Sequence, residues 1–270
     1  MVDIEPSQML TKVPPAIPAV LLFGLSHVVA LRQAQADRNH RRAVTFNLVV
    51  EELLPKFNPL GRREQGRQVL NEAIEPELRR IVEEIEPQII IAALWADQHF
   101  FMSTANLPRR LDFVLPAEPD LALDPAAELV PYDLMREQFR LHCGYLELMV
   151  EAARRVARAP LHLLPAPPPV ADFGAIPGGS SNKHMDRLVA EHGVAPALLR
   201  YKFWRLISDI YNQMAAARGA KSLPVPPECL APDGFRRAEY NSTDWIHANP
   251  QYGELVLKQI DALLAQKAES

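Results

Sequence analysis

The chain is poor in the residues on which several classes of protein depend. It has 2 cysteines and 11 glycines among 270 residues. Cys143 and Cys229 are too few for a disulfide framework, and they could form a zinc site only with histidine or carboxylate ligands. The glycines form neither a G-x-G-x-x-G nor a G-x-x-x-x-G-K-[ST] pattern. The sequence therefore lacks the two common glycine-rich loops that cradle phosphates.

An excess of charge of one sign and a long apolar run are also missing. The 29 Lys and Arg residues against 33 Asp and Glu give 29 − 33 = −4, without a basic block, which argues against nucleic-acid and anionic-membrane partners. The apolar stretch at 16–30 is too short and too interrupted to span a bilayer. Ala34-Gln35-Ala36 after it resembles a signal-peptide cleavage site, but Asp3 and Glu5 before it are atypical of a secretion signal. We expect a cytoplasmic protein with no membrane partner.

Short apolar runs alternate with longer amphipathic stretches along the chain. Strands are predicted at 19–23, 43–50, 88–94 and 161–164, with a weaker one at 222–225, and helices at 28–38, 69–85, 133–157, 196–218 and 251–266. This alternation is typical of a parallel sheet with helices on both faces, and right-handed crossovers make the sandwich doubly wound. We expect an α/β fold with about five parallel strands, formed by residues 1–270 as one domain. The proline-rich residues 106–131 are expected to be an extended surface loop.

Ligands of such sheets bind at the carboxyl ends of the strands, and reactive side chains follow the first strand. Gly24 permits a sharp turn, after which Ser26 and His27 lie where the strand gives way to a helix. A hydroxyl exposed there, with backbone N–H groups beside it, suits a nucleophile whose product is an oxyanion. The alternative is that Ser26 only caps the helix, a common role of serine.

A second reactive group of residues precedes the last predicted helix. Asp244 and His247 are three residues apart, so in a tight loop the carboxylate can hold one imidazole nitrogen and orient the other toward a hydroxyl. The alternative is a loop whose Asp244 and Asn249 only cap that helix. Either motif alone is common, but the two together favour Ser26, His247 and Asp244 as catalytic residues.

These two motifs resemble those of the SGNH (GDSL-like) hydrolases. The residues G-L-S-H at 24–27 are similar to the family's turn around its nucleophilic serine, and Asp244, His247 and the following N-P-Q-Y-G at 249–253 are similar to its last block. The resemblance implies a flavodoxin-like α/β/α fold and hydrolysis of a carboxylic ester or O-acyl group. It makes Ser26 the nucleophile, His247 the base and Asp244 its orienting partner. The substrate would be a small-molecule or glycan ester, with no cofactor and no metal.

The family's oxyanion hole is matched least well. It uses the N–H of the nucleophile, a glycine after the second strand and an asparagine after the third. Here W-A-D-Q-H follows the third predicted strand, which places Asp97 where the asparagine donor is expected. A carboxylate accepts hydrogen bonds, so Gln98 would have to donate instead if the loop is shifted by one residue. Gly24, His27, His99 and Asn249 are expected to line the same cleft as Asp97 and Gln98. Only Gly61 and Gly66 are available as the glycine.

Two other functions stay open. Asp97 in the oxyanion position would fit a catalytically impaired module that binds a glycan or acyl ligand. An acyl-enzyme could also pass its acyl group to an alcohol if water is excluded, which would make the protein an acyltransferase. A cysteine nucleophile has no support, because neither Cys143 nor Cys229 lies in a motif that pairs a thiol with an activating base.

Overall fold

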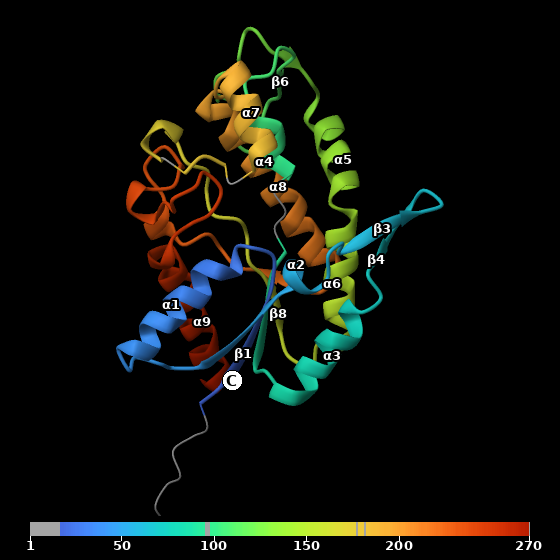
Figure 1. Ribbon diagram of the computed structural model, residues 1–270, viewed down its shortest axis with the longest axis vertical. Coiled ribbons are helices and arrows are strands. Elements are labelled where there is room, and N and C mark those ends of the chain that lie inside the picture. Colours follow the sequence, from blue (N-terminus) through green and yellow to red (C-terminus); the bar gives the residue numbers. More distant parts are fainter. Residues whose placement is uncertain (1–16, 95–97, 177, 181, 270) are drawn as a thin grey trace, which may run out of the picture.

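A five-stranded parallel sheet forms the centre of the computed structural model, which describes residues 17–94, 98–176, 178–180 and 182–269 (Figure 1). The strands lie in the order β2 (Asn47–Glu52), β1 (Ala19–Gly24), β5 (Ile89–Ala93), β8 (Leu161–Leu163) and β9 (Lys221–Ser222). Renumbered along the chain, this order is 2-1-3-4-5, the order of flavodoxin-like sheets. The predicted fold class, a three-layer α/β/α sandwich, is confirmed.

The central strands are buried on both faces. β1 and β5 have almost only buried apolar residues, as expected for parallel strands covered by helices on either side. Leu21 of β1 is in register with Val49 of β2 on one side and with Ile90 of β5 on the other. Because all strand pairs in this sheet are parallel, the carboxyl ends of the strands meet at one edge.

Alternate residues of β1 point into two different cores. Val20 and Leu22 pack in the core beneath α1 (Val28–His40) and α9 (Pro250–Glu269). Leu21 and Phe23 pack in the core on the opposite face of the sheet. The helices there are α3 (Ile74–Ile85), α6 (Gly144–Val156) and α8 (Ala197–Ala217), and Figure 1 shows them across the sheet from α1 and α9.

A third and smaller cluster, which we call the satellite core, lies apart from the two faces of the sheet. It is built from α4 (Gln98–Ser103), the short helix η1 (Phe173–Ala175) and α7 (Lys183–His192), and its buried members are Phe100, Ala105, Val170, Phe173, Ile176 and Met185. Trp245 and Ile246, from the loop before α9, pack against it. The satellite core therefore joins the chain that follows β5 to the chain that precedes α9.

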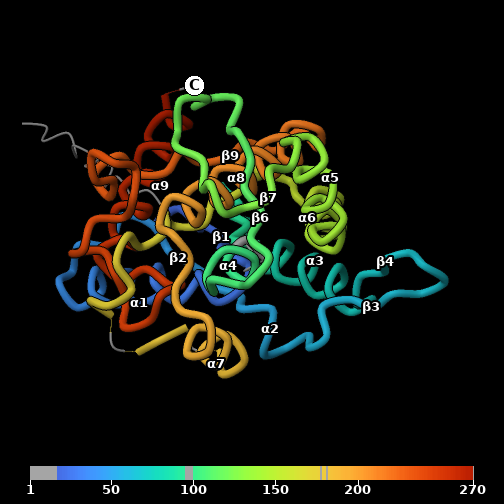
Figure 2. Tube along the Cα trace, turned by 90° about the horizontal axis from the view of Figure 1, so that it is seen from above, coloured from blue at the N-terminus to red at the C-terminus, as the bar shows by residue number. Residues whose placement is uncertain are grey.

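The helix predicted over 69–85 is wrong in its first part. A hairpin of β3 (Gly61–Glu64) and β4 (Arg67–Leu70) precedes α3, and Figure 2 shows it projecting from the body of the molecule. Gln65 and Gly66 both have positive φ, 47° and 82°, so the chain reverses between the two strands. Val69 consequently pairs with Arg62 across the hairpin and does not extend the helix.

The single helix predicted over 133–157 is also wrong, because α5 (Tyr132–His142) and α6 are separated by Cys143. α5 packs against α8, whereas α6 packs against α3 and β4, and one straight helix does not make both sets of contacts. Two strand boundaries also differ. The second strand begins at Asn47, and the last is reduced to Lys221–Ser222, followed by Pro224, which has no N–H for a ladder.

The proline-rich residues 106–131 contain two short strands, β6 (Leu111–Asp112) and β7 (Glu128–Leu129), which pair in parallel. A buried ion pair ties this segment to α8. Lys202 Nζ lies 2.8 Å from Asp112 Oδ1, and the two side chains are 1% and 5% exposed. Lys202 also donates a hydrogen bond to the carbonyl of Ala122, at 2.8 Å. The segment is therefore anchored at two points.

The remaining short elements are α2 (Leu53–Lys56), η2 (Pro227–Cys229) and η3 (Ala238–Tyr240). α7 lies between the strand predicted at 161–164 and the helix predicted at 196–218, where no helix was expected. The Asn182 side chain caps it by accepting hydrogen bonds from the N–H groups of His184 and Met185. Among the described residues, no helix is both long enough and apolar enough to cross a membrane.

Candidate active site

The turn after β1 brings Ser26 to the carboxyl edge of the sheet. The Leu25 N–H donates a hydrogen bond to the carbonyl of Ala93 at the end of β5, at 2.9 Å. A β-carbon on Gly24 would collide with that same carbonyl, so only glycine lets β1 end this close to β5. α1 then begins at Val28, and no side chain caps its first turn. Ser26 is therefore not the helix cap.

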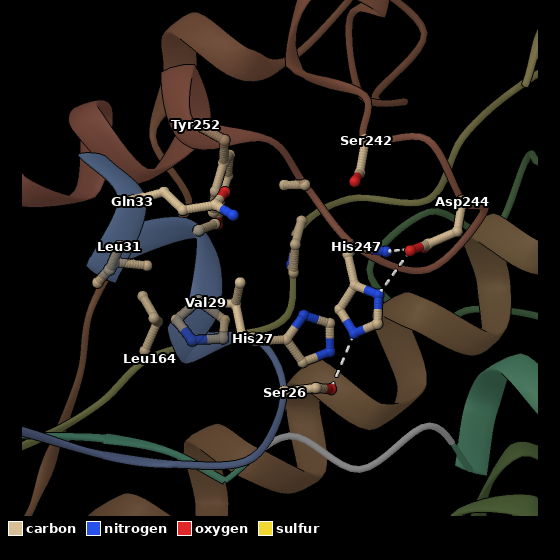
Figure 3. Close-up of a pocket in the computed structure, with 14 residues that line it drawn as sticks. Ser26, His27, Val29, Leu31, Gln33, Leu164, Ser242, Asp244, His247 and Tyr252 are labelled. Atoms are coloured by element: carbon tan, nitrogen blue, oxygen red, sulfur yellow. Dashed lines mark hydrogen bonds and ion pairs between the residues drawn. The ribbon is translucent and has the colours of Figure 1, made fainter. Parts of the chain in front are cut away.

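Ser26, His247 and Asp244 meet at this edge although 221 positions separate Ser26 from His247. His247 Nε2 lies 2.8 Å from Ser26 Oγ, and His247 Nδ1 lies 2.9 Å from Asp244 Oδ2. Figure 3 shows the three side chains in a line, with the imidazole between the hydroxyl and the carboxylate. The structure thus brings together the three residues that the two sequence motifs supplied.

Backbone hydrogen bonds hold the Asp244 carboxylate in this orientation. Its Oδ1 accepts hydrogen bonds from the N–H of Ile246, at 2.9 Å, and from the N–H of His247, at 2.7 Å. Burial raises the pKa of the Asp244 carboxyl, but the hydrogen bonds from the His247 ring and backbone and from Ile246 outweigh burial and hold this pKa at about 2. Asp244 is therefore ionised at neutral pH, with Oδ2 facing the imidazole.

The loop that carries Asp244 and His247 is closed at its base. Asn241 and Ala248 form an antiparallel bridge, and the Ser242 N–H donates to the carbonyl of His247 at 3.4 Å. The buried Arg236 donates a hydrogen bond from Nε to Asn241 Oδ1, at 2.9 Å. Because this bridge encloses only residues 242–247, Asp244 and His247 are kept close together.

A pocket of about 210 Å³ opens beside Ser26 and His247. Helix α1, the chain after β8 and the loop before α9 form its walls (Figure 3). The lining residues other than Ser26, Asp244 and His247 are His27, Val29, Ala30, Leu31, Gln33, Leu164, Pro165, Pro167, Ser242, Ala248 and Tyr252. Sequence reasoning did not assign most of them to the site. Helical spacing could have suggested Val29, Ala30 and Gln33, which follow Ser26 by three, four and seven residues.

His27 and Asn249 have different surroundings. His27 lines the pocket, and its ring centroid lies 5.1 Å from that of His247. Asn249 was expected in the cleft, but its Oδ1 accepts from the Tyr252 N–H at the start of α9, and its Nδ2 donates to the carbonyl of Glu239. This expectation is corrected, because the Asn249 side chain caps a helix and ties it to η3.

The structure describes only some of the residues proposed for the oxyanion hole. Asp97 lies outside the described residues, and Gln98 and His99 begin α4 with side chains that are also outside them. Gly61 and Gly66 belong to the β3–β4 hairpin, so neither follows a strand of the central sheet. No described residue accepts a hydrogen bond from the Ser26 N–H, which lies just before α1. This N–H is therefore a candidate for the first donor of an oxyanion hole.

Other reactive groups in the described part of the chain are remote or buried. No three His, Cys, Asp or Glu side chains among these residues are grouped so that they could hold a metal ion. Burial raises the pKa of the Cys143 thiol to about 12 and that of the Cys229 thiol to about 11. Both thiols are therefore protonated and poor nucleophiles at neutral pH.

Several solved structures are distantly similar to this chain. No family model and no curated protein matches its sequence. A Bacteroides fragilis protein proposed to be an acylhydrolase is 11% identical, with a TM-score of 0.43 over 93% of this chain and 90% of the other. The periplasmic domain of a Salmonella ser. Paratyphi A lipopolysaccharide acetyltransferase is 11% identical, with a TM-score of 0.49 over 92% and 84%. A GDSL-like lipase from Bacteroides thetaiotaomicron is 10% identical, with a TM-score of 0.41 over 92% and 88%. The fold assigned above rests on the strand order and not on these likenesses.

Proposed function

We propose that the protein is a serine hydrolase that cleaves a carboxylic ester or an O-acyl group. The observation that carries the proposal is the hydrogen-bonded line from Ser26 Oγ through the His247 ring to Asp244, beside a pocket at the carboxyl edge of a parallel sheet. The resemblance of the G-L-S-H and Asp-x-x-His motifs to those of SGNH hydrolases supports the same reaction.

The charge of Asp244 fixes the direction of the proton transfers. An ionised carboxylate can only accept hydrogen bonds, so His247 carries its proton on Nδ1 and accepts the Ser26 proton at Nε2. As Ser26 Oγ attacks the carbonyl carbon of the ester, Nε2 takes the hydroxyl proton. The imidazolium that forms is stabilised by Asp244 at 2.9 Å.

Collapse of the tetrahedral intermediate completes the acyl transfer. The Ser26 N–H before α1 donates to the developing oxyanion, where the amino end of the helix also favours negative charge. His247 then gives its proton from Nε2 to the leaving alcohol, and an acyl-Ser26 ester remains. Water, deprotonated by the same nitrogen, hydrolyses this ester and returns Ser26 to its starting state.

Labelling with a fluorophosphonate probe tests the nucleophile. We expect the native protein to be labelled and the Ser26→Ala variant to show no label. Ser180, whose hydroxyl donates to Asp186, offers a matched control, and Ser180→Ala should be labelled like the native protein. Labelling that survives Ser26→Ala would remove Ser26 from the mechanism.

Turnover separates a hydrolase from the two alternatives. Hydrolysis of short p-nitrophenyl esters above the Ser26→Ala background excludes a module that only binds a glycan or acyl ligand. Adding an alcohol tests acyl transfer, since an acyltransferase would form a new ester at the expense of the free acid. We expect the free acid to dominate.

A further inference from the structure

The two residues between Asp244 and His247 are held by contacts of their own, outside the pocket. Trp245 stacks on Phe173 of η1, with ring centroids 4.6 Å apart and an angle of 7° between the ring planes. The guanidinium carbon of Arg200, from α8, lies 4.1 Å from the centroid of the same Phe173 ring. Because two groups this close cannot share one face of a ring, Trp245 and Arg200 cover opposite faces of Phe173.

Arg200 is held rigidly and supports this stack. Its side chain is buried, Nη1 donates to the carbonyl of Ala195 at 2.5 Å, and Nη2 donates to the carbonyl of Ala171 at 2.6 Å. The guanidinium is therefore fixed by backbone carbonyls that come before and after Phe173 in the chain. A buried cation on an aromatic face is a stronger contact than an exposed one.

Backbone contacts hold the same loop from its outer side. The Trp245 N–H donates to the carbonyl of Gly179 at 2.9 Å, and Trp245 Nε1 donates to the carbonyl of Ile176 at 3.3 Å. A β-carbon on Gly178 would collide with the carbonyl of Thr243, so glycine is required for this close approach. The satellite core thus holds Trp245 while the base of the loop is closed by Asn241 and Ala248.

We propose that the Arg200–Phe173–Trp245 stack positions the catalytic loop and keeps His247 Nε2 within hydrogen-bond reach of Ser26 Oγ. The inference rests on the proposed function. Phe173 and Trp245 do not line the pocket beside Ser26, so they act through His247 and are positioning residues. A base displaced by about 1 Å is expected to cost on the order of 10²-fold in rate.

The pH dependence of turnover tells positioning apart from a general loss of folded protein. With the base in place, the rate rises as the imidazole loses its proton and then reaches a plateau. With the base displaced, hydroxide must remove the Ser26 proton, so the rate keeps rising about tenfold for each pH unit. If the stack only stabilised the fold, its removal would lower the rate by the same factor at every pH.

The test uses paired substitutions in the full-length protein. Phe173→Leu and Trp245→Leu remove the stack, whereas Trp245→Phe keeps an aromatic ring on Phe173. Phe139→Leu is the control, because Phe139 is a buried aromatic residue that packs on Phe203 in the core beneath α3, α6 and α8, away from the satellite core. For each variant, kcat and KM for p-nitrophenyl acetate are measured between pH 6 and 10, with the Ser26→Ala background subtracted.

We expect both leucine variants of the stack to lose kcat by roughly 10- to 100-fold at pH 7, with little change in KM, and to lose the plateau. Trp245→Phe and Phe139→Leu should keep the plateau. Trp245 is only partly buried, so Trp245→Leu should fold even if Phe173→Leu does not. A plateau retained in Trp245→Leu would overturn the inference. Native turnover equal to that of Ser26→Ala would instead refute the proposed function itself.

Discussion

Replacement of Asp244 by asparagine should reverse the direction of both hydrogen bonds that the His247 ring makes, one with residue 244 and one with Ser26. Asp244 Oδ1 accepts two backbone N–H groups, those of Ile246 and His247, and only an oxygen can take that place. The asparagine oxygen must therefore occupy the Oδ1 position, and its NH₂ group then faces His247 Nδ1. Since an NH₂ group only donates, Nδ1 must become the acceptor and Nε2 must carry the proton.

A proton on Nε2 removes the base. Nε2 would donate to Ser26 Oγ across the 2.8 Å contact and could no longer accept the hydroxyl proton. The expected loss in kcat is about 10⁴-fold, the cost of the wrong imidazole tautomer in a Ser-His-Asp triad. At about 1.36 kcal/mol for each factor of ten, this corresponds to roughly 5.5 kcal/mol of barrier. Stability should change little, because both backbone hydrogen bonds to the side-chain oxygen remain.

The assay is the hydrolysis of p-nitrophenyl acetate at pH 7.5, with thermal unfolding of the same samples as a check on the fold. Asp186→Asn is the matched control, because Asp186 accepts hydrogen bonds from the Ser180 hydroxyl and N–H and no histidine faces it. We expect Asp186→Asn to be nearly as active as the native protein. Activity of Asp244→Asn within tenfold of native would refute the reasoning, since the tautomer would then not depend on the carboxylate.

Three further outcomes follow from contacts described above. Turnover should rise with pH as His247 loses its proton, since a general base must be neutral, while Asp244, with a pKa of about 2, stays ionised; a flat pH–rate profile would contradict a histidine base. Gly24→Ala should destabilise the fold by about 1–3 kcal/mol in urea titrations, because its β-carbon meets a carbonyl of β5, and a native-like midpoint would be inconsistent with that close approach. Lys202→Met should lower the unfolding free energy by about 3–5 kcal/mol, since it leaves the Asp112 carboxylate buried without its cation; the double variant with Asp112→Asn should recover part of this loss.

The parts of the fold that were predicted correctly depend on short-range patterns. β1 is an unbroken apolar run ended by Gly24, and the parallel sheet with helices on both faces follows from the alternation of strands and helices. The motif from Asp244 to His247 lies within four residues, so its local geometry is accessible to sequence reasoning. That Ser26 lies against His247 could be expected from the rule that ligands bind at one edge of a parallel sheet and from the resemblance of the two motifs to those of SGNH hydrolases.

The errors have a common cause in patterns that fit two structures equally well. Leu70, Ile74 and Leu78 are four residues apart, as on one face of a helix, although Leu70 pairs with Gly61 in a hairpin. On α5, Leu134 and Leu141 share one side of the helix, a spacing typical of a buried face. Both side chains are nevertheless exposed, at 53% and 54%. Tertiary partners decide these cases, and a single sequence does not reveal them.

The positioning stack could not be predicted for a related reason. Phe173 lies in a segment without apolar periodicity, and its partners Arg200 and Trp245 are 27 and 72 positions away. No motif or spacing in the sequence links these three residues. Only the packing of η1 against the loop before α9 shows that they belong together.

The packing of α9 against α1 has a consequence for biosynthesis. Ser26 leaves the ribosome among the earliest residues of the sheet, whereas His247 is translated 221 positions later. A nascent polypeptide that already holds its hydroxyl therefore has no imidazole to activate it. Reactivity toward acyl groups should arise only with the docking of the last helix, in one late step of maturation, and release from the ribosome before residue 247 should yield an inert product.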